Sequence, residues 1–305
     1  MVPVWNAFDH NYNEITGWPI KLPVVPWSSD TVLLMHFQDF VTHQDGRIVE
    51  LDQLADHYGG RAGQIIVTHM HHGLEKLYTG PVHLIEYSNH NVREMTRLLD
   101  RKDQWLAVVE RPKTQAWQCL NGRLCEHRFR AAAVLQHWPN GVLSLGTEMP
   151  LPRWHYGTYA GTENDENFVR LLWVYGSCAV NIITETQYNH WPGVISEKTL
   201  LAFVSQQLPV LISYAGAVAD TRDLGFDMFD DIIDHSYDCL PNSQRAEQAL
   251  LRNQQLIQSP PDLAAYQARL KINRDHALYT LPRYYQKLFE RGARDFADRT
   301  LGKIF

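Results

Sequence analysis

The sequence lacks the cysteine pattern of a disulfide-stabilised or zinc-binding protein. Only four cysteines occur in 305 residues, at positions 119, 125, 178 and 239, and none of them forms a CxxC pair. Positions this scattered build neither a disulfide framework nor a zinc ribbon, so we expect reduced thiols.

Long apolar runs are also missing. No stretch approaches the ~20 apolar residues that a membrane-spanning helix needs. The first residues, MVPVWNAFDHNYNE, contain neither the basic segment nor the apolar segment of a secretory signal. We therefore expect a cytoplasmic protein without a membrane partner.

The signatures of several enzyme classes are absent as well. The chain contains no GxGxxG, GxxxxGK[ST], GxSxG or HExxH motif. Dinucleotide-binding, P-loop, serine-hydrolase and zinc-protease interpretations therefore lack support. The formal net charge of −6 argues against a surface that binds nucleic acid throughout, although basic segments such as RLCEHRFR (123–130) leave a local site open.

What is present is an alternation of short apolar runs with amphipathic stretches, which predicts an α/β fold built on parallel sheets. We expect strands at 31–37, 64–70, 82–87, 115–120, 140–145, 178–186 and 208–214. We expect helices at 47–60, 91–102, 125–138, within 163–175, at 196–207 and at 218–225, the last followed by Gly225 at C′, and mostly helix from residue 244.

This order predicts two Rossmann-like α/β lobes, finished by C-terminal helices. The expected segments are an N-terminal lobe at 1–110, a C-terminal lobe at 111–245, and helices at 246–305 that pack back on the lobes. Ligands of open α/β sheets bind at the carboxyl ends of the strands, so the residues that follow each strand are the first candidates for a site.

The segment NIITETQYNHWPGVISEKTLLAF (181–203) places charges beside a buried strand and a helix start. Ser196 is a preferred N-cap, and Glu197, Lys198 and Thr199 then fill the first turn. A helix N-terminus attracts phosphate, and Lys198 adds a full positive charge there. Glu185 and Glu197 are placed to accept hydrogen bonds from a ribose diol. A simple capped helix with solvated Glu and Lys side chains remains an alternative.

Residues 178–238 resemble part of the α-1,3-fucosyltransferase family and, more closely, glycosyltransferase-like proteins of phages and giant viruses. The blocks that carry the resemblance are NIITET, SEKTLLAFVSQQLPVLIS and TRDLGFDMFDDIIDHSYD, with a weaker one at LNGRLCEHRFRAAAVL (120–135). The chain departs from the family pattern at Ser196, where Thr is usual, at His235, where Glu is frequent, and at Gly122 and Cys125, where Arg is frequent.

The resemblance implies a GT-B-like fold whose C-terminal lobe holds the donor. It also implies a metal-independent glycosyltransferase with no prosthetic group that takes a sugar from a nucleotide-diphosphate donor. It implies that Glu185 and Glu197 bind the ribose or sugar and that Lys198 binds the phosphates. Arg123 and Arg128 would neutralise the leaving diphosphate. The full set of predicted donor-binding residues is Arg123, Arg128, Glu185, Thr186, Ser196, Glu197, Lys198 and Thr199.

A general base is needed to deprotonate an acceptor hydroxyl, and we look for it after the N-terminal strands. The candidates are Asp39, His69 and Glu86. His69 also belongs to THMHHG (68–73), but alternation directs His69 and His71 to one face and His72 to the other, so we predict no metal site.

Three kinds of acceptor remain open: a glycan, a protein, or a modified base in phage DNA such as a hydroxymethylated pyrimidine. If the chain is viral, we expect it in the host cytoplasm. Two other classes also remain. One is a catalytically silent protein that binds nucleotide sugars, and the other is a different nucleotide-dependent α/β hydrolase.

Overall fold

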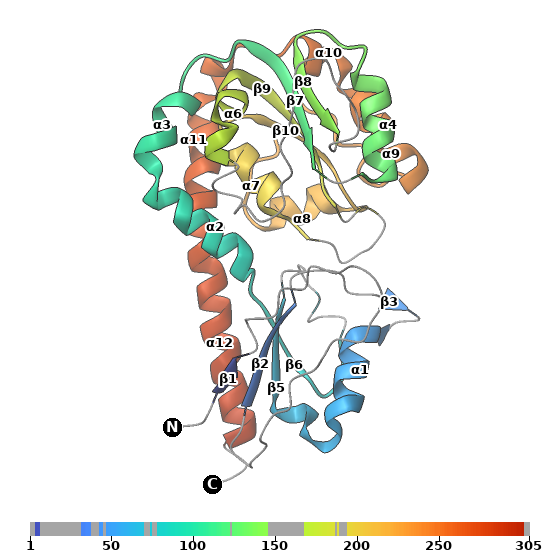
Figure 1. Cartoon of the computed structure of the whole chain (residues 1–305), viewed down its shortest axis with the longest axis vertical. Helices are drawn as coiled ribbons and strands as arrows, with labels where there is room; N and C mark the ends of the chain where they lie inside the picture. The colour runs from blue at the N-terminus through green and yellow to red at the C-terminus, as the bar shows by residue number, and fades with distance from the viewer. Residues whose placement is uncertain are drawn as a thin grey trace. The chain divides into compact units, whose positions relative to one another are not determined.

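The computed structural model describes residues 4–6, 32–37, 43–44, 47–69, 74, 78–122, 124–145, 168–186, 188 and 194–301. Over these residues the chain is a mixed α/β protein with two four-stranded parallel sheets and many helices, which end in the long helix α12 (Leu281–Leu301) (Figure 1). The predicted α/β class, the parallel sheets and the helical C-terminal part are confirmed.

The chain divides into two compact units. Unit 1 comprises Met1–Asn89 and Tyr284–Phe305, and unit 2 comprises His90–Arg283. The expected segments end instead at residues 110 and 245. Residues 90–110 belong with unit 2 because the helix at 102–109 packs on another helix of that unit. The second part of α12 belongs with unit 1 because it packs on the sheet of that unit.

Unit 1 is built on a sheet of four parallel strands in the order β1-β2-β5-β6. Its elements are β1 (Val4–Asn6), β2 (Val32–Phe37), the pair β3 (His43–Gln44) and β4 (Arg47–Ile48), α1 (Val49–Tyr58), the 3-10 helix η1 (Gly59–Gln64), β5 (Ile65–His69) and β6 (His83–Glu86). The expected strands begin only at residue 31, and β1 was missed because three residues show no periodicity.

Alternate residues of β5 point to opposite faces of this sheet. Ile65 and Val67 pack with the leucines of α1, whereas Ile66 packs with Phe296 of α12. The strand is therefore buried on both sides, which is why it reads as a continuous apolar run.

Gly292 lets α12 lie close to this sheet. A Cβ added there would lie 2.8 Å from Cγ1 of Ile85, and Nε2 of His83 donates to the Gly292 carbonyl at 3.0 Å. We expect Gly292→Val to lower the free energy of unfolding by about 2 kcal/mol, because the added methyls overpack the contact. Urea denaturation measures this. The exposed Arg294→Val introduces valine on the same helix without a close contact to overpack. An equal loss there would contradict the close-packing explanation.

Unit 2 contains the remaining elements. They are α2 (Asn89–Asp100, of which only Asn89 belongs to unit 1), α3 (Lys102–Val109), β7 (Gln115–Asn121), α4 (Glu126–Leu135), β8 (Gly141–Leu145), α6 (Leu172–Ser177), β9 (Cys178–Thr184), α7 (Glu197–Val204), β10 (Leu208–Ile212), α8 (Ala217–Asp223), α9 (Asn242–Arg252), α10 (Gln254–Gln258), η3 (Leu263–Tyr266), α11 (Gln267–Asp275), the π-helical turn η4 (His276–Thr280) and the start of α12. Each predicted strand and helix of this part has a counterpart, and Gly225 takes a positive φ of 95° one residue after the C-cap of α8, as predicted.

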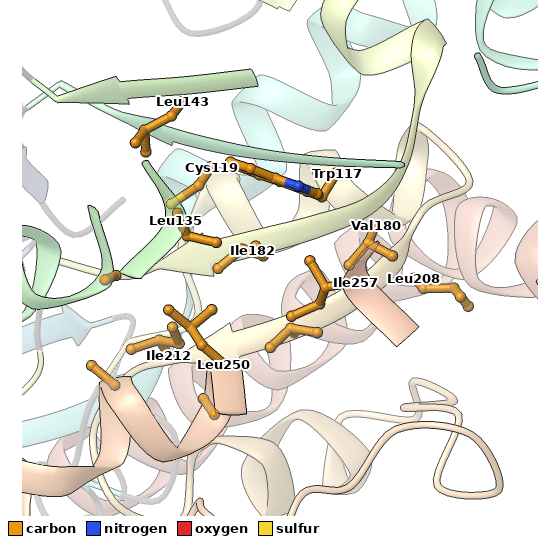
Figure 2. Packing of buried hydrophobic residues seen from close by; sticks show 14 of the residues in the cluster. Trp117, Cys119, Leu135, Leu143, Val180, Ile182, Leu208, Ile212, Leu250 and Ile257 are labelled. Carbon is orange, nitrogen blue, oxygen red and sulfur yellow. The ribbon is translucent and has the colours of Figure 1, made fainter. Parts of the chain in front are cut away.

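The sheet of unit 2 has the order β10-β9-β7-β8, and all its neighbours are parallel. Helices α4, α9 and α10 cover one face, where side chains such as Trp117, Val180 and Ile212 meet Leu135 and Leu250 (Figure 2). Helices α6 and α7 contact the strands and lie on the other face (Figure 1). This two-sided burial fixes the strand ends and the helix starts that form the candidate site.

Candidate functional site

The strand order of unit 2 creates a topological switch point between β7 and β9. From β7 the chain proceeds through α4 to the neighbouring edge strand β8, whereas from β9 it proceeds through α7 to β10 on the other side. The segments that follow β7 and β9 therefore diverge at the carboxyl edge of the sheet, and this is where open α/β sheets bind their ligands. The predicted donor-binding residues follow these two strands.

Glu185 fixes the start of α7 to the end of β9. Its Oε1 accepts hydrogen bonds from the backbone N–H of Ser196 at 3.1 Å and from Oγ1 of Thr199 at 2.6 Å. Its Oε2 accepts from Oγ of Ser196 at 2.6 Å, and that hydroxyl oxygen in turn accepts from the N–H of Lys198 at 3.2 Å. The predicted N-cap and first turn are confirmed.

These contacts give Glu185 a positioning role. The residue is 1% exposed and both of its carboxylate oxygens are engaged inside the protein. A carboxylate at a helix N-terminus also offsets the partial positive charge there. The predicted contact of Glu185 with a ribose stays a prediction.

Glu197 and Lys198 form an ion pair in the first turn of α7. Nζ of Lys198 lies 2.9 Å from Oε1 of Glu197, and Nε2 of His90 lies 3.3 Å from Oε2 of the same carboxylate. Burial opposes ionisation of Glu197, but Lys198 and His90 outweigh it and hold the pKa of Glu197 well below its usual range. The side chain of Lys198 remains 31% exposed.

Arg128 is placed at the switch point by α4. The residue is fully buried, and its Nη2 donates to the carbonyl of Thr184 at 2.7 Å and to Oγ1 of Thr186 at 3.2 Å. Thr184 also donates to Oδ1 of Asn121 at the end of β7. The guanidinium therefore ties α4 to β9, and its predicted contact with the leaving diphosphate stays a prediction. Arg123 lies outside the described residues.

His127 also binds the segment that follows β9. It is stacked on Tyr188, with ring centroids 4.2 Å apart, and its Nε2 donates to the carbonyl of Glu185 at 2.8 Å. Burial lowers the pKa of His127 to about 4, so the ring is neutral at physiological pH.

Arg245 is a residue that the sequence interpretation missed. Its five N–H groups donate to the carbonyls of Tyr188 and Ser213, twice to that of Leu240, and to Oδ1 of Asn242. It thereby joins the segments after β9 and β10 to the start of α9. No local pattern marks it, because an arginine in an amphipathic helix normally indicates the solvent face.

The base candidates lie in unit 1. His69 and Glu86 end the neighbouring strands β5 and β6, are register partners, and are both buried. Their side chains therefore leave the sheet on one face. Asp39 lies outside the described residues, as do His71 and His72. The role of general base stays a prediction for all three candidates.

The described part of the chain contains neither a metal-binding cluster nor a membrane-spanning helix. No group of three or more His, Cys, Asp or Glu side chains there is arranged to hold a metal ion. Among the described helices, none is long and apolar enough to cross a membrane.

A cavity of ≈ 650 Å³ opens at the amino ends of β7 and β9, where Lys113, Gln115 and Ala179 line it. This is the edge opposite to the switch point. Because ligands of open α/β sheets bind at the carboxyl ends of the strands, we place the candidate site at the other edge.

Comparison with known proteins identified no relative: no family model, no curated protein and no solved structure matches the chain.

Proposed function

We propose that the chain is a metal-independent glycosyltransferase of GT-B type, with two Rossmann-like lobes, whose unit 2 holds a nucleotide-diphosphate sugar. The acceptor oxygen would attack the anomeric carbon, the bond from that carbon to the diphosphate would break, and a general base would take the acceptor proton. The nucleotide diphosphate would then leave with the bonding electron pair.

The observation that carries the proposal is the position of Lys198. Its side chain is partly exposed in the first turn of α7, beside a switch point where Arg128 adds a second positive charge. A diphosphate there would meet a cation at the partly positive start of a helix. Glu197 is held ionised next to Lys198 and offers acceptor oxygens to a sugar or ribose hydroxyl.

A thermal-shift screen of UDP-, GDP-, ADP- and CMP-sugars tests donor binding. A ligand at a hundredfold its dissociation constant should add about 2.7 kcal/mol of stability. Folded protein that responds to none of these donors would overturn the proposal.

Lys198→Met tests the predicted phosphate contact. We expect it to weaken binding of the donor found in the screen roughly 10- to 100-fold, because a charge-assisted hydrogen bond is lost. Isothermal titration calorimetry measures the affinity. The control Lys271→Met removes the same charge from an exposed position of α11 and should leave the affinity unchanged. Equal affinity in the two variants would contradict the assignment.

Turnover separates the proposal from its two alternatives. A glycosyltransferase releases free nucleotide diphosphate when donor and acceptor are both present, whereas a silent binding protein holds the donor and releases nothing. Activity that survives Lys198→Met and is abolished by EDTA would favour the hydrolase. The acceptor screen should include hydroxymethylated DNA, a glycan and a protein.

A further inference from the structure

The first turn of α2 contacts both sides of the N-cap of α7. Nδ2 of Asn91 donates to the carbonyl of Ile195 at 2.8 Å, immediately before Ser196. Nε2 of its neighbour His90 lies 3.3 Å from Oε2 of Glu197, immediately after Ser196. His90 is also the first residue of unit 2. Two consecutive residues at the point where the chain enters this unit therefore hold the start of the candidate donor helix.

His90 lies in a mixed electrostatic environment. Glu197, which is paired with Lys198, faces it from α7, and Glu94 and Arg93 lie on its own helix. Lys198 in turn interacts with the negative charge of the Glu185 carboxylate and the positive charge of the Arg128 guanidinium.

Together these groups favour the protonated form of His90. Burial alone would lower its pKa, but the hydrogen bond to Glu197 and the charges of Glu197 and Glu94 outweigh burial and raise the pKa of His90 above its ordinary value. Glu197 stays ionised throughout this range because its own pKa is lowered. When His90 loses its proton, the group formed by His90, Glu197 and Lys198 therefore loses one positive charge, while the charge of Glu197 does not change.

We propose that His90 is a positioning residue of the donor site, which orients Glu197 and, when protonated, adds a positive charge that strengthens diphosphate binding. This inference rests on the proposed function. With His90 neutral, Glu197 and Lys198 cancel each other. With His90 protonated, the three side chains carry a net positive charge, and Oε2 of Glu197 is held by the imidazolium. By linkage, a bound diphosphate must in turn favour the protonated ring.

The test is the affinity for a nucleotide-diphosphate sugar between pH 5.5 and 8.5, measured by calorimetry with the full chain. A nucleotide sugar is the right probe because it lacks the terminal phosphate that titrates near pH 6. We expect the wild-type affinity to fall about fivefold as the pH rises, as a single partly exposed charge would give. His90→Gln should show a flat profile, and the exposed His137→Gln should keep the wild-type profile.

The possible failures are distinguishable. Binding whose pH dependence survives in His90→Gln would overturn the role of His90 and leave the proposed function intact. Absence of binding by any nucleotide sugar would overturn the proposed function and this inference with it. If His90→Gln does not fold, the pKa of His90 is followed by NMR in wild type. It should rise when the nucleotide sugar is added and be lower in Glu197→Gln, and no change in either case would overturn the proposal.

Discussion

Replacing Arg245 with Met is expected to lower the free energy of unfolding by about 4 kcal/mol, because it leaves several buried acceptors without a donor. Arg245 is 2% exposed, and all five of its N–H groups are bonded to neutral oxygens. Methionine fills a similar volume but donates nothing. The guanidinium also lies 5.1 Å from the ring centroid of Tyr188, and this cation–π contact is lost as well.

Urea denaturation at constant pH measures this effect. The matched control is Arg252→Met, on the same helix, where the side chain is exposed and its partners are Gln248 and Ser236. We expect the control to lose less than about 1 kcal/mol, as is usual for surface residues. Similar losses in the two variants would show that the acceptors around Arg245 find other donors.

The second large effect is an acid sensitivity that His127 introduces. Burial lowers the pKa of this ring to about 4 in the folded protein, while the ordinary value in an unfolded chain is about 6.5. Between these two values the unfolded state binds more protons than the folded state. The free energy of unfolding must therefore fall as the pH is lowered from about 6.5 to 4, by about 3 kcal/mol for this group.

Other groups titrate in the same range, so the measurement compares variants. Burial also lowers the pKa of His235, which acts in the same direction, and raises the pKa of Asp238 to about 6, which acts in the opposite one. His127→Gln removes only one of these contributions. The stability difference between wild type and His127→Gln should shrink as the pH falls from 7 to 4.5. A difference that stays constant over this range would disprove the effect, and His137→Gln should parallel the wild type.

Much of the local structure follows from short-range patterns in the sequence. Apolar runs such as CAVNIIT predicted strands that are buried on both faces, and Ser196 predicted the N-cap of α7 because a short polar side chain before an apolar helix satisfies the free N–H groups. Gly225 was predicted by the same kind of rule, since only glycine takes a positive φ at C′ without strain.

The pairing of side chains at the site was not predictable in this way. The sequence placed Glu185 and Thr199 in one short segment, but their hydrogen bond depends on how β9 and α7 pack. His90 and Glu197 are far apart in the sequence, and no periodicity connects them. Arg245 looked like a surface residue because its buried partners belong to segments that meet only in the folded unit.

The sequence by itself therefore determined the types and approximate positions of most strands and helices, the caps at Ser196 and Gly225, and the residues of the first turn of α7. Those features depend on neighbours within a few residues, which the sequence states directly. Only the tertiary structure decided the strand order β10-β9-β7-β8, the switch point between β7 and β9, and the partners of Glu185, Glu197 and Arg245. These depend on the sum of many weak contacts between distant segments, and no single stretch of sequence contains that sum.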